Sequence, residues 1–189
     1  MTKKNVKIIC GISIIVFVIL KTLGVDFLDA LSYAVSIAAV TGYCYDRLLW
    51  RFNIFDKTPR LHGVYDALFI SNYNRCTIHP SVVNIKQTLS SISIYEEAKE
   101  GYSVAVTADL VRDGPESNPW HLYYTYLTYP SPNDHDDAHH GTAILCVKSS
   151  LLIEGSYYTN RIGQTKGKLI LIRRKNPKIA CPIDPVKYQ

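Results

Sequence analysis

The feature that most constrains this chain is a pair of uncharged, apolar segments within its first fifty residues. The segments Ile8–Leu20 and Ala30–Tyr45 contain no charged side chain over 13 and 16 positions. As helices they would span about 20 and 24 Å, which is short of the ~30 Å hydrocarbon layer of a bilayer. Extended to Val6–Val25 and Phe27–Trp50, both are long enough to cross if the flanking basic side chains reach the interface. We therefore expect a two-helix transmembrane hairpin that turns at residues 24–26.

Two other interpretations of these segments stay open. Lys3, Lys4 and Lys7 resemble the basic region of a signal peptide, but residues 21–25 offer no small-x-small cleavage site and a second apolar run follows. A pair of buried helices in a soluble protein would need a polar face, which the first run lacks. The hairpin is the interpretation that accounts for both runs together.

Charge placement predicts the orientation of the hairpin. Three lysines precede the first segment, and four basic residues lie between positions 47 and 60, whereas the turn carries only Asp26 and Asp29. The positive-inside rule then places both flanks, and everything after residue 50, on the cytoplasmic side. Cys10 and Cys44 lie in the apolar runs, and the three remaining cysteines show no paired spacing, which favours a reducing compartment.

After residue 60 the pattern changes from continuous apolar runs to an alternation with period two, which indicates short strands separated by Gly, Pro, Asn and Asp. No long amphipathic helix interrupts them. Eight strands joined in sequence predict an all-β domain, a small eight-stranded up-and-down antiparallel β-barrel, with a flattened sandwich as the alternative. The expected organisation is a hairpin at 1–52, a linker at 53–60, a cytosolic barrel sensor at 61–175 and a tail at 176–189. The expected strands are Leu61–Ser71, Val82–Leu89, Ile92–Glu96, Tyr102–Val111, Trp120–Tyr129, His140–Lys148, Leu152–Asn160 and Lys168–Arg173.

The chain has 14 Tyr and only 5 Phe, and 11 of the tyrosines lie after residue 60. Strand alternation puts Tyr65 on one face with Ala67, Tyr124 and Tyr126 on one face of their strand, and Tyr157 in line with Gly155. The interior of an eight-stranded barrel has room for packed side chains or one small ligand. Inward tyrosines would offer flat rings for stacking and hydroxyls for hydrogen bonds, although core packing is the simpler role for each of them.

Several short motifs occur in a recognisable order along almost the whole chain. Two apolar helices and a basic N-terminus come first, and the motifs follow at Trp50–Phe55, Pro59–Tyr65, Ile85–Thr88, Leu122–Tyr126, His140–Ala143 and Leu152–Arg161, with Thr165 and Gly167 just beyond. In this order and spacing the chain resembles the transmembrane β-barrel effectors of bacterial CBASS anti-phage systems, the cyclic-oligonucleotide-based signalling defences.

The resemblance implies a function. It implies a barrel that binds a cyclic dinucleotide made by a partner nucleotidyltransferase (CD-NTase), then self-association, and then disruption of the bacterial inner membrane in abortive infection. The expected partners are this ligand, the lipid bilayer and further copies of the chain, with no nucleic-acid polymer and no cofactor. The residues that we expect to stack on bases, donate or accept hydrogen bonds, or hold phosphate are Tyr65, Gln87, Tyr124, Tyr126, Tyr157, Arg161 and Thr165.

Other functions are less well supported by the residues. The sequence has no Gly-x-Ser-x-Gly elbow, no phosphate-binding Gly-rich loop and no His-Glu-x-x-His, so we expect no enzyme and no catalytic residue. The acidic and histidine-rich segment Asp134–His140 is expected to be a polar hairpin loop and not a metal site, and Arg173–Lys175 a solvated strand end. Two alternatives remain: a membrane-tethered, lipocalin-like carrier of a small apolar ligand, to which the Gly63-Val64-Tyr65 motif is similar, and a structural protein whose filled barrel docks another protein.

Overall fold

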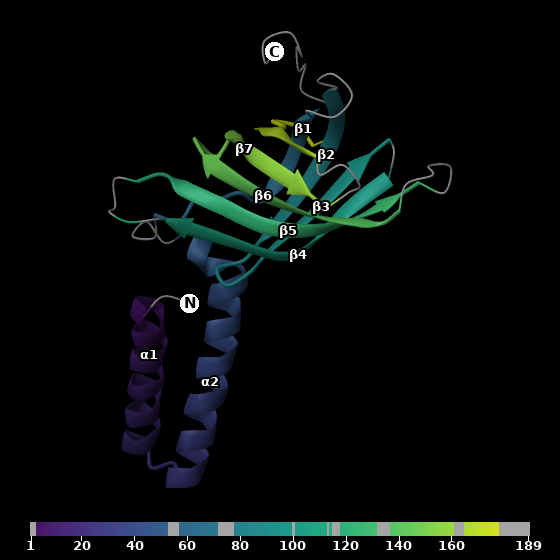
Figure 1. Ribbon diagram of the computed structural model, residues 1–189. Helices are drawn as coiled ribbons and strands as arrows, with labels where there is room; N and C mark the ends of the chain where they lie inside the picture. The colour runs from purple at the N-terminus through teal and green to yellow at the C-terminus, as the bar shows by residue number, and fades with distance from the viewer. Residues whose placement is uncertain are drawn as a thin grey trace. The chain divides into compact units, whose positions relative to one another are not determined.

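The computed structural model describes residues 3–52, 57–71, 78–99, 101–112, 114, 118–131, 137–160 and 165–177. The side chains of residues 3–9 and of Ile78 are outside this description. The chain divides into two compact units, one made of Met1–Lys57 with Thr88–Ser90 and the other of Thr58–Gln87 with Ser91–Gln189. The first unit is helical and the second is a barrel, and each is described by itself (Figure 1).

The helical unit is a hairpin of two helices, α1 (Lys3–Thr22) and α2 (Phe27–Arg47), followed by a short 3₁₀ helix, η1 (Leu49–Phe52). Gly24 occupies the turn between the helices with a φ of 81°, a left-handed conformation that favours glycine. The rings of Phe17 and Phe27 then meet edge to face, with centroids 5.6 Å apart. The predicted turn is therefore confirmed. The buried residues of α2 are Ala30 and Ala34, which lie one turn apart on one face.

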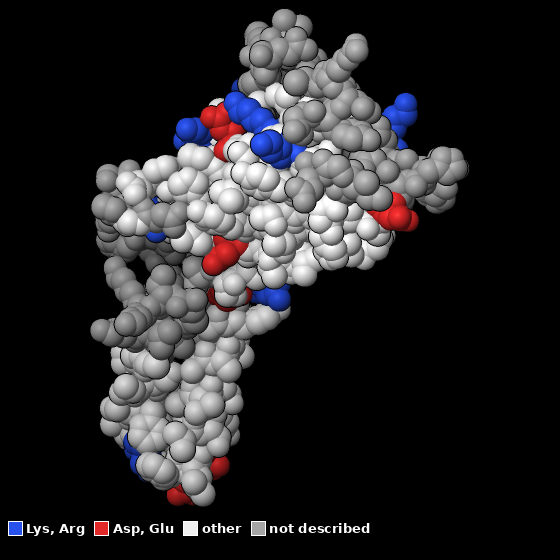
Figure 2. Space-filling view, viewed as in Figure 1, with Lys and Arg blue, Asp and Glu red and all other residues white. Residues whose placement is uncertain are grey.

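Most large apolar side chains of this unit point outward, which a water-exposed hairpin would not favour. The charged side chains of the described helices lie near the helix ends, with Lys21 and Asp29 beside the turn and Asp46 and Arg47 at the end of α2. Figure 2 shows charged atoms at the turn and an uncharged surface along the helices. One helix, α2, is long and apolar enough to cross a membrane, whereas the described apolar part of α1, Cys10–Thr22, is shorter. The structure confirms both helices and supports one candidate span, where the sequence predicts two.

The second unit is a closed barrel in which each strand pairs antiparallel with the next and β8 pairs back to β1. This confirms the eight-stranded up-and-down β-barrel and not the sandwich. Closure leaves no free sheet edge, which explains why a single short-stranded sheet is stable here. The strands are β1 (Gly63–Ser71), β2 (Ile78–Gln87), β3 (Ile92–Ala98), β4 (Gly101–Arg112), β5 (Trp120–Pro130), β6 (His139–Val147), β7 (Leu152–Thr159) and β8 (Lys166–Arg173).

The predicted strand boundaries lie within two residues of the observed ones except at the start of β2. That strand begins at Ile78 instead of Val82 and includes Pro80 opposite Leu68 of β1. A proline is accommodated here because β2 pairs with β3 only from Ser81 onward. The missing N–H of Pro80 therefore removes no hydrogen bond between β2 and β3. Strand β4 contains a bulge between Ala105 and Thr107, which shifts its register against β5.

Strands β1, β3, β5 and β7 all begin at the same end of the barrel, which we call the linker end because the chain enters it there. This end is closed by hydrogen bonds to the entering chain. The Gln87 side chain accepts from the Leu61 N–H at 2.6 Å and donates to the Pro59 carbonyl at 3.0 Å. The Tyr65 hydroxyl donates to the Leu61 carbonyl at 2.8 Å, and burial raises the pKa of Tyr65 to about 12, although the nearby Arg173 guanidinium lowers it somewhat.

The end of β8 is solvated only in part: Lys175 is exposed as predicted, whereas Arg173 and Arg174 are not. Arg174 donates from Nε and Nη2 to one carboxylate oxygen of Asp66, at 3.0 and 2.6 Å, and both side chains are largely buried on the outside of β1. Arg173 donates to the His62 carbonyl at 2.5 Å. The prediction was wrong for Arg174 because its partner, Asp66, lies on the outer face of the neighbouring strand β1. Alternation along β8 alone cannot reveal a charge on another strand.

Candidate functional site

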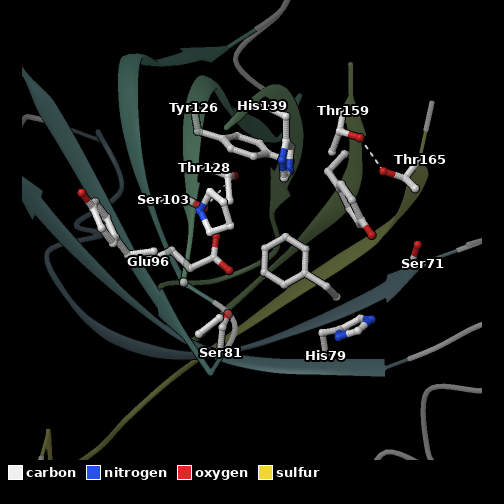
Figure 3. Close-up of a pocket in the computed structure, with 16 residues that line it drawn as sticks. Ser71, His79, Ser81, Glu96, Ser103, Tyr126, Thr128, His139, Thr159 and Thr165 are labelled. Atoms are coloured by element: carbon white, nitrogen blue, oxygen red, sulfur yellow. Dashed lines mark hydrogen bonds between the residues drawn. The ribbon is translucent and has the colours of Figure 1, made fainter. Parts of the chain in front are cut away.

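The far end of the barrel, where β1, β3, β5 and β7 finish, holds a cavity of about 160 Å³. Pockets that bury most of a drug-sized ligand measure about 300–1,000 Å³. The barrel cavity is therefore small, with room for one ring system. Its lining residues, drawn in Figure 3, are Phe69, Ser71, His79, Ser81, Glu96, Ala98, Gly101, Tyr102, Ser103, Tyr126, Thr128, Pro130, His139, Tyr157, Thr159 and Thr165.

The position of the barrel cavity follows from the composition of the inward-facing rows. At the linker end these rows are aliphatic and form the packed core, with residues such as Ile85, Leu122 and Ile153 fully buried. Towards the far end the same rows change to hydroxyl, carboxyl and imidazole groups. Polar side chains can hydrogen-bond to water in a cavity, whereas aliphatic side chains pack against one another and leave little space. The polar ends of the rows are Ser71, Ser81, Glu96, Ser103, Thr128, His139, Thr159 and Thr165.

Two tyrosines form the aromatic walls of the barrel cavity, and each lies across from a glycine on the neighbouring strand. Tyr126 of β5 is in register with Gly141 of β6, and Tyr157 of β7 is in register with Gly167 of β8. A Cβ at Gly141 would overlap the Tyr126 ring, and one at Gly167 would crowd both the Tyr157 ring and the Ile70 backbone. Glycine at these positions therefore fixes where the rings lie.

Polar contacts hold the remaining walls in place. Burial raises the pKa of the Tyr157 phenol, and the neighbouring Ser71 side chain partly offsets this. The Tyr157 ring meets Phe69 edge to face, with centroids 5.1 Å apart. Across the barrel, the hydroxyls of Ser103 and Thr128 are 3.0 Å apart. Thr159 and Thr165 join the ends of β7 and β8 through a hydroxyl–hydroxyl bond, shown as a dashed line in Figure 3. The lining thus offers many groups that both donate and accept.

Glu96 is the acidic residue of this lining, and in Figure 3 its carboxyl points into the barrel cavity between Ser81 and the side of Tyr126 and Thr128. The residue keeps partial access to solvent, yet the protein around it raises the pKa of the carboxyl from 4.5 to about 7. Burial is the main cause, and the neighbouring Ser81 and Ser103 hydroxyls, which favour the charged carboxylate, partly offset it. The carboxylate in turn raises the pKa of the Tyr126 phenol, for which burial is the larger cause.

The sequence-predicted binding residues fall into three groups. Tyr126, Tyr157 and Thr165 line the barrel cavity together. Tyr124 is buried in the core beside Tyr126, with ring centroids 5.7 Å apart, and is not a lining residue. Tyr65 and Gln87 lie at the linker end, where they hold the entering chain, and Arg161 lies outside the described residues.

Sequence reasoning missed several residues of the barrel cavity, above all Glu96 together with His79 and His139. The signal was present, because Ile92, Ile94 and Glu96 alternate on one face of their strand and the first two are apolar. An acid at the end of an inward row is unexpected for a filled barrel. Neighbouring strands of an antiparallel barrel run in opposite directions, so residues at the same end of the barrel come first in one strand and last in the next. Their positions in the sequence therefore do not show that they meet.

The described residues contain no group of three or more His, Cys, Asp or Glu side chains that could hold a metal ion. The segment Asp134–His140, which the sequence predicts as a polar loop and not as a metal site, lies partly outside this description, at residues 134–136. Of its described residues, His139 places Nδ1 3.2 Å from the Asp137 carbonyl, and the His140 N–H donates to the Asn160 side chain at 2.7 Å. These contacts are those of a strand end.

Comparison with known proteins adds a relationship to this geometry. The family model described as "Cap15, cyclic dinucleotide receptor domain" matches residues 56–173, which include the whole barrel. The chain is also similar to CD-NTase-associated protein 15 of Staphylococcus schleiferi. The two are 31% identical over 156 residues, which cover 80% of this chain and 82% of the relative.

Proposed function

The chain belongs to the Cap15 cyclic dinucleotide receptor family of CBASS effectors, and from this premise we propose that it binds a cyclic dinucleotide in the barrel cavity and acts without catalysis. The observation that carries the proposal is the cavity itself, with two tyrosine walls and a ring of hydroxyls at one end of an otherwise packed barrel. Aromatic walls stack on any base, and stacking contributes roughly 1–3 kcal/mol per base.

The size of the barrel cavity supports a specific mode of binding. It accommodates one base, so the second base and the two phosphates stay at the mouth. Tyr126 and Tyr157 contact the enclosed base, and Thr165 lies at the rim beside the ends of β7 and β8. Arg161 belongs to the segment that joins these two strands, and we propose that its guanidinium holds a phosphate.

The helical unit supports the second part of the proposal, which is action at a membrane. We propose that α1 and α2 both cross the bacterial inner membrane, with both termini and the barrel in the cytoplasm, as the flanking charges predict. The outward apolar surface of both helices is suited to lipid. Ligand would stabilise association between barrels and so concentrate the short helices in the bilayer, where mismatch costs add up.

A titration tests the receptor step. The full chain in detergent micelles is titrated calorimetrically with cyclic di-GMP, cyclic di-AMP, cyclic di-UMP and the mixed dinucleotides. We expect at least one to bind, and Tyr157→Ala to weaken that binding at least tenfold, whereas Tyr158→Ala, its exposed neighbour, leaves affinity unchanged. Absence of binding by every cyclic dinucleotide would refute the proposal.

The membrane step has its own readout. The chain is reconstituted into dye-loaded vesicles, and release is measured before and after the ligand that binds, with light scattering in micelles to follow association. We expect ligand-dependent association and leakage, both reduced by Gly42→Leu, which adds bulk on a half-buried position of α2. Leakage that is the same with and without ligand would contradict the membrane step while leaving the receptor step intact.

A carrier of apolar molecules is disfavoured by the hydroxyl-rich lining.

A further inference from the structure

Glu96 is a residue that the proposed function leaves without a role. A cyclic dinucleotide carries two phosphates, and a carboxylate repels them. None of the described residues that line the barrel cavity is Lys or Arg, so no lining cation pairs with this acid there. An anionic ligand can bind beside this carboxyl group only if the part of the ligand that faces the carboxyl supplies hydrogen-bond donors.

The surroundings of Glu96 leave the carboxyl available to such donors. Ser81 of β2 and Ser103 of β4 flank it and can each supply one hydroxyl hydrogen. A carboxylate has about four acceptor sites, so at least two stay open towards the cavity. Ser103 also shares its hydroxyl with Thr128. Tyr126 presents its ring to the same space (Figure 3), and burial first, then the Glu96 charge, raises the pKa of the Tyr126 phenol, so the ring and the carboxyl are neighbours in the cavity.

The bases of nucleotides differ in what they present on the edge that faces away from the sugar. Guanine presents two adjacent donors, N1–H and N2–H, whose spacing matches the two oxygens of one carboxylate. Adenine presents one donor beside an acceptor, cytosine presents one donor, and uracil presents a donor between two carbonyl acceptors. Unpaired acceptors facing a carboxylate are costly, so discrimination is expected to follow these patterns.

We propose that Glu96 is a specificity-determining residue, which accepts N1–H and N2–H of a guanine base stacked against Tyr126 in the barrel cavity. This inference rests on the proposed function, since it names the base of the same ligand. The carboxylate form makes the contact, because a protonated carboxyl has lost one acceptor. Burial raises the pKa of Glu96 to about 7, so binding of guanine should strengthen as the pH rises from 6 to 8.

Other titratable groups face the same space and must be separated from this effect. These groups line the barrel cavity or lie behind it, and they come from five strands. β1 contributes only the neutral Phe69 and Ser71 to the lining, and the residue before β8 is the neutral Thr165. The remaining groups are His79 of β2, Tyr102 of β4, Tyr124 and Tyr126 of β5, His139 of β6 and Tyr157 of β7. If a histidine caused the pH dependence of binding, the same pH dependence would appear in Glu96→Gln, which lacks the carboxylate. Comparing wild type with this variant therefore separates the two effects.

The experiment compares three ligands and two variants. The full chain in micelles is titrated with cyclic di-GMP and with cyclic di-IMP, whose hypoxanthine base lacks only the 2-amino group, and with cyclic di-AMP. Glu96→Gln is compared with Glu97→Gln, the exposed neighbour that points outward from the same strand. Each is measured at pH 6 and at pH 8, and thermal unfolding confirms that both variants are folded.

We expect wild type to bind cyclic di-GMP about 5- to 140-fold more tightly than cyclic di-IMP, the range that one good bidentate base contact gives. Glu96→Gln should abolish this preference and its pH dependence and shift preference towards cyclic di-AMP, because an amide matches adenine. Glu97→Gln should behave as wild type. Equal binding of cyclic di-GMP and cyclic di-IMP by wild type would overturn the inference, even if Glu96→Gln failed to fold. The same preference in both folded variants would overturn it as well. Binding of cyclic di-AMP alone among these ligands would overturn the inference while upholding the proposed function. No binding of any cyclic dinucleotide, including those in the receptor titration, would refute the proposed function itself.

Discussion

The ring of Tyr126 lies across the strand pair from Gly141, in the space that any larger residue at 141 would occupy. The ring is therefore positioned by the absence of a side chain on the neighbouring strand. Tyr126 is 5% exposed, although it forms a wall of the barrel cavity, so its position is set by packing before any ligand arrives.

Gly141→Ala should displace the Tyr126 ring and reduce both stability and ligand affinity. Overpacking of a tight interior costs about 1–3 kcal/mol, and the moved ring would enter the barrel cavity. Calorimetric titration and denaturant unfolding measure the two effects. Thr142→Ala is the control, since Thr142 is the exposed next residue of β6. Unchanged affinity in Gly141→Ala would show that the ring position does not matter for binding.

The stability of the ligand-free barrel should fall as the pH rises towards 7 and above. Because the pKa of Glu96 is raised from 4.5 to about 7, the folded state holds this proton more tightly than the unfolded state. The stabilisation is complete below pH 4.5 and is lost through pH 7, by up to about 3 kcal/mol. Denaturant unfolding of wild type and Glu96→Gln across pH 5 to 8 isolates this contribution. Parallel pH profiles for the two proteins would contradict the prediction.

Asp66→Ala should destabilise the barrel by about 3–5 kcal/mol, because it leaves Arg174 largely buried without its carboxylate. The double hydrogen bond from Nε and Nη2 is lost at the same time. Glu154→Ala is the matched control, because Glu154 pairs with the exposed Lys168 at 3.2 Å and such pairs contribute less than about 1 kcal/mol. Similar melting temperatures for the two variants would show that the Asp66 pair adds little.

Gln87→Ala should lower stability without lowering affinity for ligand. Its side chain bonds to the backbone of Pro59 and Leu61 at the linker end, and loss of the two bonds costs about 1–3 kcal/mol. The barrel cavity is at the other end of β2. Thermal unfolding and titration are compared with Thr165→Val, which should show the opposite pattern. A large loss of affinity in Gln87→Ala would return Gln87 to the binding site.

The architecture was predictable because the two halves of the chain have different periodicities. Continuous apolar runs gave the helices of the first unit, and alternation with period two gave the eight strands of the second. The inward positions of Tyr126 and Tyr157 followed from the same alternation, and both are confirmed as buried. Such local patterns depend only on neighbours in sequence, so one chain is enough to read them.

The amino-acid sequence by itself thus determined the helical hairpin, the barrel and the faces of its strands. Only the tertiary structure decided which inward residues form a cavity and which close the barrel. Tyr65 and Tyr126 both face inward, yet closure of β8 onto β1 and the antiparallel order place one among aliphatic groups and the other beside Glu96. The height of a residue along the barrel depends on the register of all eight strands, which is a property of long-range pairing and not of local alternation.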